Sequence, residues 1–478
     1  MANPPHATST NVTSPRSDED NSSPSETTAK GVSHAESARP RPSAVDEELY
    51  SVPDEYSNLD EVAAPWPVEN VADGPVYRHS SLEAVRSHEQ QWRARRSQEL
   101  PEPPSEAEAR KEIVSKFLTK LYTLSYLVFF ALMGTLARLG LTALTHYVGT
   151  PVIFPTIWAN FGGSLVMGFL AEDRMLFRHE WGTPTYDRAL ARAKAQNHEQ
   201  SASSTSDSMP APDIASAKKQ HVATKKTIPL YIGLATGFCG SFTSFSAFIR
   251  DVFLAMSNDL VTPASGTETQ SRNGGYSFMA MLAVIITTVG LSLAALVFGA
   301  HLAIATERIV PSIPFPITRR LLDPLFVLLG WGCWLGAVFM CIFPPHDRWR
   351  GQATFSLVFA PLGCLARFYL SIYLNGKVAA FPLGTFAANV IGTAVLGIAW
   401  DIAHVQIGGI VGCQVLQGVE DGFCGCLTTV STWVAELNSL RRRNAYTYGA
   451  TSIVVSFAIM VLVLGGLRWT DGWSALVC

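Results

Sequence analysis

One motif occurs twice in this chain, as GFCGSFTSFSAF at residues 237–248 and as GFCGCLTTVSTW at residues 422–433. Each copy combines glycines, which permit unusual backbone angles, with hydroxyl side chains that can satisfy freed backbone groups. In a bilayer, an interrupted helix is tolerated only where it is buried in protein or lines a wet cavity. For one copy alone, small-residue helix packing is the stronger interpretation. The duplication reverses that preference and predicts two broken membrane helices, with breaks at Gly240–Thr243 and Gly425–Thr428.

Two further motifs are repeated in the same order before the first. The segment Gly134-Thr-Leu-Ala-Arg138 corresponds to Gly363-Cys-Leu-Ala-Arg367, and each arginine is followed 22 residues later by an asparagine, Asn160 or Asn389. Three motifs that recur in one order identify an internal duplication. The first copy is longer because of a Ser/Ala/Lys-rich segment near 179–226, which we expect to be a disordered cytoplasmic insert.

Apolar segments of membrane-spanning length follow one another from about residue 121, and they predict an all-α membrane protein. Nine spans are expected, at about 121–147, 153–171, 228–256, 278–306, 321–343, 354–374, 382–404, 407–437 and 445–468. Each copy of the duplicated unit contains four spans, and the span at 321–343 resembles none of the motif helices. One extra span inverts the second four-helix repeat relative to the first. Inverted repeats place a site at their shared interface near the bilayer midplane.

The expected domains are a disordered N-terminal tail at 1–115, a first repeat at 116–308, a linking helix at 319–345 and a second repeat at 352–470. The tail is rich in Ser, Pro, Glu and Ala and shows no cleavable signal peptide. Lys and Arg concentrate in the loops on one side of a nine-span chain. This bias places the N-terminus in the cytoplasm and the C-terminus outside the cell.

The eight cysteines fall mostly within apolar segments. We expect them to be small buried residues at helix contacts, in preference to disulfides or metal ligands. Cys424 and Cys426 have no second pair and no nearby histidine, which argues against a zinc site. The spans contain no Ser/His/Asp set, phosphate-binding loop or paired carboxylates, so we do not expect an enzyme.

Polar and charged side chains within the spans are candidates for an ion pathway. Asn160 and Asn389 are expected either to hydrogen-bond between helices or to donate N–H groups to a desolvated anion. Arg138 and Arg367 lie toward the ends of apolar runs. They are interpreted either as a structural clamp or as an electropositive vestibule.

The third motif adds aromatic and hydroxyl groups. Phe245 and Phe248 lie three residues apart on one helical face, where they either pack or present positive ring edges to an anion. Ring edges can stabilise an anion without holding it as tightly as a fixed cation, which suits conduction. Ser246 and Ser431 contribute hydroxyl donors at equivalent positions of the two copies.

Together, the three motifs resemble those of the CrcB/Fluc fluoride channels, and two such units joined by one helix look like the two-repeat eukaryotic fluoride exporters. The resemblance covers about 121–468. It implies passive, selective exit of fluoride across the plasma membrane through a monomer that acts as a pseudo-dimer in membrane lipid, with no nucleic-acid partner. It also implies a central structural sodium ion bound by the backbone carbonyls of Gly240, Thr243, Gly425 and Thr428.

The second repeat departs from the family pattern at the two phenylalanine positions, which hold Val430 and Trp433. In the family, each pore draws one such phenylalanine from each half. One pore here would therefore hold Phe245 with Trp433, and the other Val430 with Phe248. We expect a single conducting pore, the doubly aromatic one.

Two other functions compete with a fluoride channel. An ion-coupled secondary transporter of another small anion would be favoured by midplane acidic residues, and we interpret the motif helices as lacking them. A non-transporting membrane scaffold would have no obvious use for broken, duplicated Gly/Thr helices.

Overall fold

The computed structural model is all-helical throughout the residues that it describes. These are residues 53, 55–56, 59, 106–147, 149–173, 175–177, 225, 227–260, 271–314, 317–344, 350–405 and 409–478, without the side chains of 106–115 and 352. All of them belong to one unit, Leu49–Cys478.

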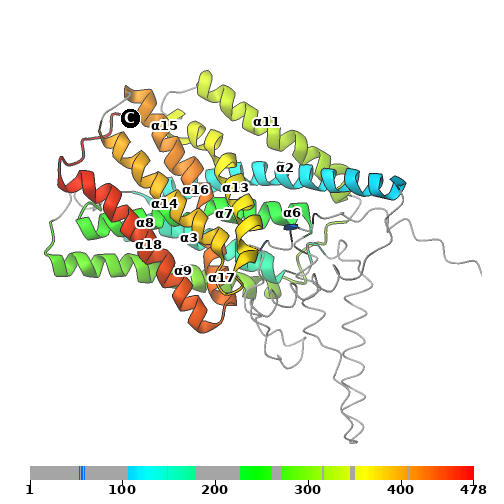
Figure 1. The fold of residues 1–478 in the computed structure, drawn as a ribbon, viewed down its shortest axis with the longest axis horizontal. Coiled ribbons are helices and arrows are strands. Elements are labelled where there is room, and N and C mark those ends of the chain that lie inside the picture. Colours follow the sequence, from blue (N-terminus) through cyan, green and yellow to red (C-terminus); the bar gives the residue numbers. More distant parts are fainter. Residues whose placement is uncertain are drawn as a thin grey trace, which may run out of the picture. The chain divides into compact units, whose positions relative to one another are not determined.

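The first repeat is built from four helical segments, of which the third is interrupted (Figure 1). They are α2 (Glu106–Thr145), α3 (Thr156–Glu172), the run of α6 (Pro229–Ile232), η5 (Gly233–Cys239), α7 (Gly240–Phe242) and α8 (Phe245–Ser257), and α9 (Gly274–Ala305).

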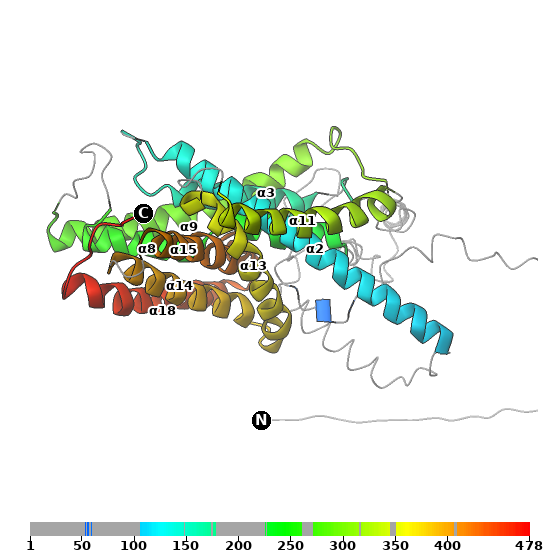
Figure 2. The ribbon, with the colours of Figure 1, turned by 90° about the horizontal axis from the view of Figure 1, so that it is seen from above.

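The second repeat has the same order of segments, and a linking helix precedes it. The linking segment comprises η7 (Thr318–Leu322) and α11 (Asp323–Ile342). The repeat comprises η8 (Arg350–Thr354), α13 (Phe355–Leu374), η9 (Asn375–Lys377), α14 (Leu383–His404), the run of α15 (Gly409–Gly418), η10 (Val419–Cys424), α16 (Gly425–Leu427) and α17 (Ser431–Ser439), and α18 (Arg442–Trp469). Figures 1 and 2 both show α18 alongside α14.

Seven helices in the described part of the chain are long and apolar enough to cross a membrane. They are Lys116–Thr145, Pro229–Ser257, Gly274–Ala305, Thr318–Ile342, Phe355–Lys377, Leu383–His404 and Arg442–Trp469. The other two predicted spans correspond to α3, which has 17 residues, and to the interrupted run α15–α17. Each forms helix where the sequence predicts it, although neither forms one uninterrupted helix of 18 residues.

The linking helix α11 packs mainly against α2 of the first repeat, and Figure 2 shows the two helices near each other. The hydroxyl of Tyr126 donates to Asp323 Oδ1 at 3.0 Å, and the backbone of Ser125 lies directly against Gly330. Most large apolar side chains of α11 are exposed, as expected for a helix that faces lipid along most of its surface.

The structure describes a few residues within the predicted N-terminal tail. Helix α2 begins at Glu106, within the tail expected to be disordered, because the segment EAEARKEIVSK contains strong helix formers and neither Gly nor Pro. Tyr56 and Leu59 are buried, and the Tyr56 ring meets that of Phe368 edge to face at 5.6 Å. Apart from residues 53, 55–56 and 59, the part of the predicted tail at 1–105 lies outside the described residues.

Lys225, within the insert predicted at 179–226, is also buried. Its ammonium group donates to the carbonyls of Leu170, Ala171 and Asp173, at or just beyond the C-terminus of α3. A cation at this end of a helix satisfies carbonyls that have no partner within the helix. The other residues of the insert lie outside the described residues.

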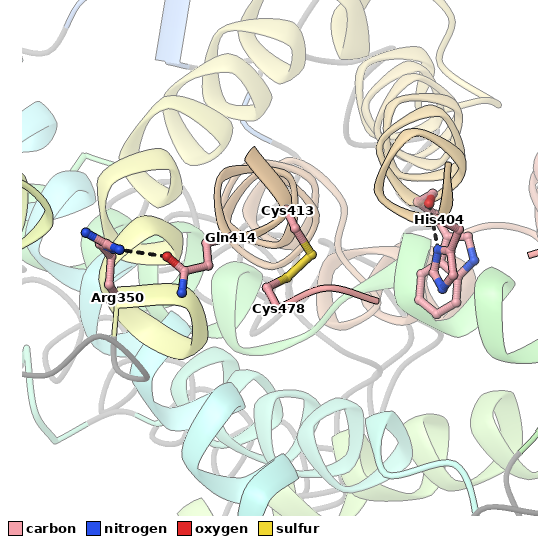
Figure 3. Close-up of a disulfide and its surroundings, with 6 residues drawn as sticks. Arg350, His404, Cys413, Gln414 and Cys478 are labelled. Atoms are coloured by element: carbon pink, nitrogen blue, oxygen red, sulfur yellow. Dashed lines mark hydrogen bonds between the residues drawn. A yellow bond between two sulfur atoms is a disulfide. The ribbon is translucent and has the colours of Figure 1, made fainter. Parts of the chain in front are cut away.

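The expectation that the cysteines form no disulfide is wrong for one pair. Cys413 of α15 is bonded to Cys478, the last residue of the chain (Figure 3). The segment after α18 folds back, and the amide of Ser474 donates to the carbonyl of His404 at the end of α14. This return brings together two cysteines that are 65 residues apart in sequence.

Candidate functional site

The two motif helices are interrupted at equivalent threonines. Thr243 is extended (φ −93°, ψ 152°), as is Thr428 (φ −91°, ψ 152°), and helix resumes at Phe245 and Ser431. A π-helical turn precedes each interruption, η5 in the first repeat and η10 in the second. Such turns are rare and frequently occur at functional sites.

The glycines of the motif do not supply the unusual angles expected of them. Gly240 (φ −66°, ψ −31°) and Gly425 (φ −62°, ψ −30°) have ordinary right-handed helical conformations. Instead, each is pressed against a guanidinium group of the other repeat, Arg367 against Gly240 and Arg138 against Gly425. A Cβ atom at either glycine would collide with that group, so the missing side chain permits close approach.

Both arginines are buried and bind backbone carbonyls across the repeats. Arg367 donates from Nη2 to Thr236 O at 2.8 Å in the first repeat, and from Nε to Cys426 O at 2.9 Å in its own. Arg138 donates from Nη2 to the carbonyl of Asp421, which precedes the motif in the second repeat as Thr236 does in the first. Both guanidinium groups therefore link the two repeats.

The two asparagines bridge the interruptions within their own repeats. The Ser244 amide donates to Asn160 Oδ1 at 2.9 Å, and Asn160 Nδ2 donates to Ser244 O at 3.4 Å. Asn389 makes the same pair of bonds with Thr429, at 2.8 and 3.2 Å. Each side-chain amide therefore replaces helical hydrogen bonds that the break removes.

The two interruptions also hold each other. Thr243 Oγ1 accepts the backbone N–H groups of Val430 and Ser431 at 3.2 and 3.1 Å. Reciprocally, Thr428 Oγ1 accepts the N–H of Ser246 at 3.0 Å. Each threonine thus caps the half-helix that begins in the other repeat, which satisfies N–H groups that lack an intrahelical partner.

The predicted hydroxyl donors take part in the same network. Ser431 Oγ donates to Cys239 O at 3.1 Å, and Ser246 Oγ lies 3.0 Å from Thr428 Oγ1. Both serines are buried where the two helix interruptions meet, at Thr243 and Thr428, a place called the crossing from here on.

Three aromatic rings are packed beside this crossing. The ring of Phe245 meets that of Trp433 edge to face at 5.3 Å and that of Phe248 at 5.6 Å. All three side chains are buried, as is Val430. The Phe245–Trp433 pair that the sequence predicts for one pore is therefore in direct contact.

The crossing offers oxygen atoms to a cation. In an unbroken helix the amide of Ser244 would bind the carbonyl of Gly240, and that of Thr429 would bind the carbonyl of Gly425. Here both amides bind asparagine side chains, so the two carbonyls lose their helical partners. Backbone carbonyls are ligands that suit a hard cation. The described residues hold no group of three or more His, Cys, Asp or Glu side chains able to bind a metal ion.

Three acidic side chains that the sequence analysis did not single out are buried on the motif helices. They are Asp251, Glu420 and Glu436. Asp251 pairs with Arg250 at 3.2 Å. Glu436 accepts the hydroxyls of Thr385 and Tyr448, each at 2.7 Å. Glu420 lies two residues before the second motif and is 7% exposed.

Comparison with known proteins identifies relatives over most of the chain. The family model described as "CrcB-like protein, Camphor Resistance (CrcB)" matches residues 125–300 and 354–466, which are the two repeats without the linking helix. Fluoride export protein 1 of Neurospora crassa is 54% identical over 458 residues, which cover 90% of this chain and 85% of that protein. Fluoride export protein 1 of Candida albicans is 34% identical over 378 residues, covering 76% of this chain and 85% of that protein.

A bacterial relative matches over a shorter stretch. The fluoride-specific ion channel FluC of Pseudomonas aeruginosa is 35% identical over 117 residues, which cover 24% of this chain but 91% of that protein. No solved structure matches. The chain therefore belongs to the CrcB family, and to the two-repeat type that the fungal fluoride export proteins represent.

Proposed function

We propose that this protein is a passive, selective fluoride channel that exports fluoride from the cytoplasm. The observation that carries the proposal is the edge-to-face pair of Phe245 and Trp433 beside two interlocked broken helices. A ring edge carries positive partial charge and offers a dehydrated anion weak, short-lived stabilisation. Conduction requires sites from which the ion can also leave. The relatives named for fluoride export support fluoride as the ion.

The pore lies between two inverted repeats in a nine-span chain. The contacts between the repeats are reciprocal. Arg367 packs on Gly240 as Arg138 packs on Gly425. Likewise, the hydroxyls of Thr243 and Thr428 each accept a backbone N–H group at the start of the half-helix in the other repeat. Reciprocal pairs are what a two-fold axis generates between two copies of one unit. A linking span that reverses the second copy makes that axis compatible with a single chain.

The C-terminus lies outside the cell, in the plasma membrane. The bond between Cys413 and Cys478 supports this orientation, because disulfides persist in oxidising compartments and are rare in the cytosol. An outward C-terminus and nine spans place the N-terminus in the cytoplasm, in agreement with the Lys/Arg bias of the loops.

A structural sodium ion fits the crossing. The carbonyls of Gly240 and Gly425 have lost their helical partners, and those of Thr243 and Thr428 belong to the same interruptions. Bound there, the ion supplies positive charge that holds the two breaks together. Replacing sodium by N-methyl-D-glucamine in purified protein should lower the melting temperature. Measurements in lithium chloride and in sodium chloride at equal ionic strength are the control. A higher melting temperature in sodium than in lithium indicates a specific ion and not a general salt effect.

The direct test is fluoride release from proteoliposomes, followed with a fluoride electrode. Vesicles loaded with potassium fluoride should release it on addition of valinomycin alone, at equal pH and equal sodium on both sides. Vesicles loaded with chloride should release little. Vesicles without protein are the negative control, and protein carrying Phe245→Ile should release fluoride more slowly than the wild type. Fluoride release that requires a proton or sodium gradient, or chloride release at the same rate, refutes the proposal.

The buried carboxyl of Glu420 favours one competing function, ion-coupled transport of a small anion. Coupling to protons would make another small anion, such as chloride, accumulate in vesicles against its gradient when a pH difference is imposed. Glu420→Gln should abolish that accumulation if the carboxyl carries the proton. A passive channel equilibrates fluoride to the membrane potential in wild type and variant alike.

A further inference from the structure

Trp433 combines deep burial with an unused hydrogen-bond donor. The side chain is 1% exposed. Its indole nitrogen Nε1 has no hydrogen-bond partner among the described residues. A buried indole N–H usually finds an acceptor, because leaving the donor unpaired in an apolar setting is unfavourable. Among the described residues, this donor therefore remains available to a mobile ligand.

The donor lies where the proposed pore passes. Trp433 meets Phe245 edge to face at 5.3 Å, and together the two rings form the aromatic pair assigned to the conducting pathway. Another edge of the indole faces α18. A Cβ atom added to Gly449 of α18 would lie 3.8 Å from Cζ2 of Trp433. Cζ2 is bonded to the carbon that carries Nε1, so this edge of the indole looks toward a residue without a side chain.

The two repeats differ at this position. Phe248 occupies the place equivalent to Trp433 in the first repeat, and a phenylalanine has no N–H group. The exchange therefore adds a single donor to one pathway and none to the other.

From these observations we infer that the indole N–H of Trp433 is a hydrogen-bond donor to the permeating anion in the Phe245 pathway. This inference rests on the proposed function and deepens it, because it names a ligand atom and a basis for selectivity. Fluoride is small and accepts hydrogen bonds more strongly than chloride does. A single neutral donor favours fluoride without the tight binding that a fixed cation would impose.

A nuclear magnetic resonance titration tests the contact directly. The chain has 11 tryptophans, and labelling with indole-15N tryptophan gives one side-chain signal for each. Trp433→Phe assigns the signal of interest, and Trp400→Phe assigns a control. Trp400 also carries an Nε1 without a partner among the described residues, but it stacks on His404 instead of contacting the phenylalanines. Sodium fluoride should move the Trp433 signal downfield, whereas sodium chloride should not, and the Trp400 signal should stay in place.

A transport assay tests the consequence. Replacing Trp433 by benzothienylalanine keeps the bicyclic ring and exchanges the N–H for sulfur. We expect fluoride efflux to fall about tenfold, in line with loss of one hydrogen bond to a charged partner. Trp400→Phe should leave efflux unchanged.

The outcomes separate the inference from the function on which it rests. If the Trp433 signal does not shift with fluoride, or if the benzothienylalanine protein keeps full fluoride efflux, the inference is wrong and the proposed channel function is unaffected. Absence of fluoride efflux from the wild-type protein overturns both.

Discussion

Arg367 of the second repeat lies with its guanidinium group against Gly240 of the first repeat, and the side chain is fully buried. Its hydrogen bonds link the repeats, because Nη2 donates to Thr236 O in the first repeat while Nε donates to Cys426 O in the second. An ionised group buried in a membrane protein is tolerated when backbone carbonyls satisfy it. The position therefore admits little variation.

Arg367→Lys should destabilise the protein strongly. Lysine lacks the planar fork that reaches two carbonyls at once, and hydrogen bonds to a charged group contribute about 1.5–3 kcal/mol each. We expect a loss of about 2–3 kcal/mol, measured as a lower melting temperature and less monodisperse protein in detergent. Arg442→Lys, at an exposed position, is the matched control. Equal melting temperatures for the two variants would contradict the clamp.

Gly240→Ala should have a similar effect for a different reason. The new methyl group would collide with the guanidinium group of the fully buried Arg367. Gly290, where a Cβ would meet nothing within 4 Å, gives the control Gly290→Ala. Expression and melting temperature should fall only for the substitution at position 240.

Asn160→Asp and Asn389→Asp should weaken both repeats alike. Aspartate keeps an acceptor for the backbone N–H but loses the Nδ2 donor, and its charge then faces the carbonyl of Ser244 or Thr429. We expect each variant to lower stability by about 2 kcal/mol or more, measured by thermal unfolding. A different result would contradict this expectation. If only one of the two variants differs from the wild type, and if it loses fluoride efflux with no loss of stability, the asparagines line a pore and do not stabilise the breaks.

Phe245→Ile should reduce fluoride efflux more than Phe248→Ile does. Phe245 contacts Trp433, whereas the predicted partner of Phe248 in the other pathway is the aliphatic Val430. Loss of a ring edge worth about 1 kcal/mol at the barrier slows passage roughly fivefold. The measurement is initial efflux rate per protein in proteoliposomes. Full efflux from both variants would show that neither pathway depends on its aromatic pair.

Cys413→Ser and Cys478→Ser should each lower stability, and the double variant should be no worse than either. The bond closes a loop across a separation of 65 residues, and native disulfides of this kind contribute about 2–5 kcal/mol. Cys333→Ser, at an exposed free cysteine, is the control.

The same bond reports on orientation. In intact cells, a membrane-impermeant reductant followed by a maleimide of high mass should label Cys413 and Cys478 if the C-terminus lies outside. Labelling that appears only after the cells are opened would place it in the cytoplasm.

The sequence by itself determined the duplication, the positions of the helices and the location of the breaks to within a few residues. It did so because membrane spans and repeated motifs leave a local signal: apolar runs of about 20 residues, and Gly, Asn and Thr at fixed spacing. The same spacing identifies Arg138, Asn160 and their counterparts in the second repeat.

Only the tertiary structure decided what these residues touch. The motif glycines have ordinary helical angles and are required because Arg367 and Arg138 reach them from the other repeat, a contact with no trace in local spacing. Thr243 caps a half-helix whose first residue, Ser431, is 188 residues away. The disulfide depends on a C-terminal segment that folds back onto α14 and α15. Packing between distant segments creates each of these relationships, because a side chain's partner is set by where the chain returns and local sequence carries no record of it.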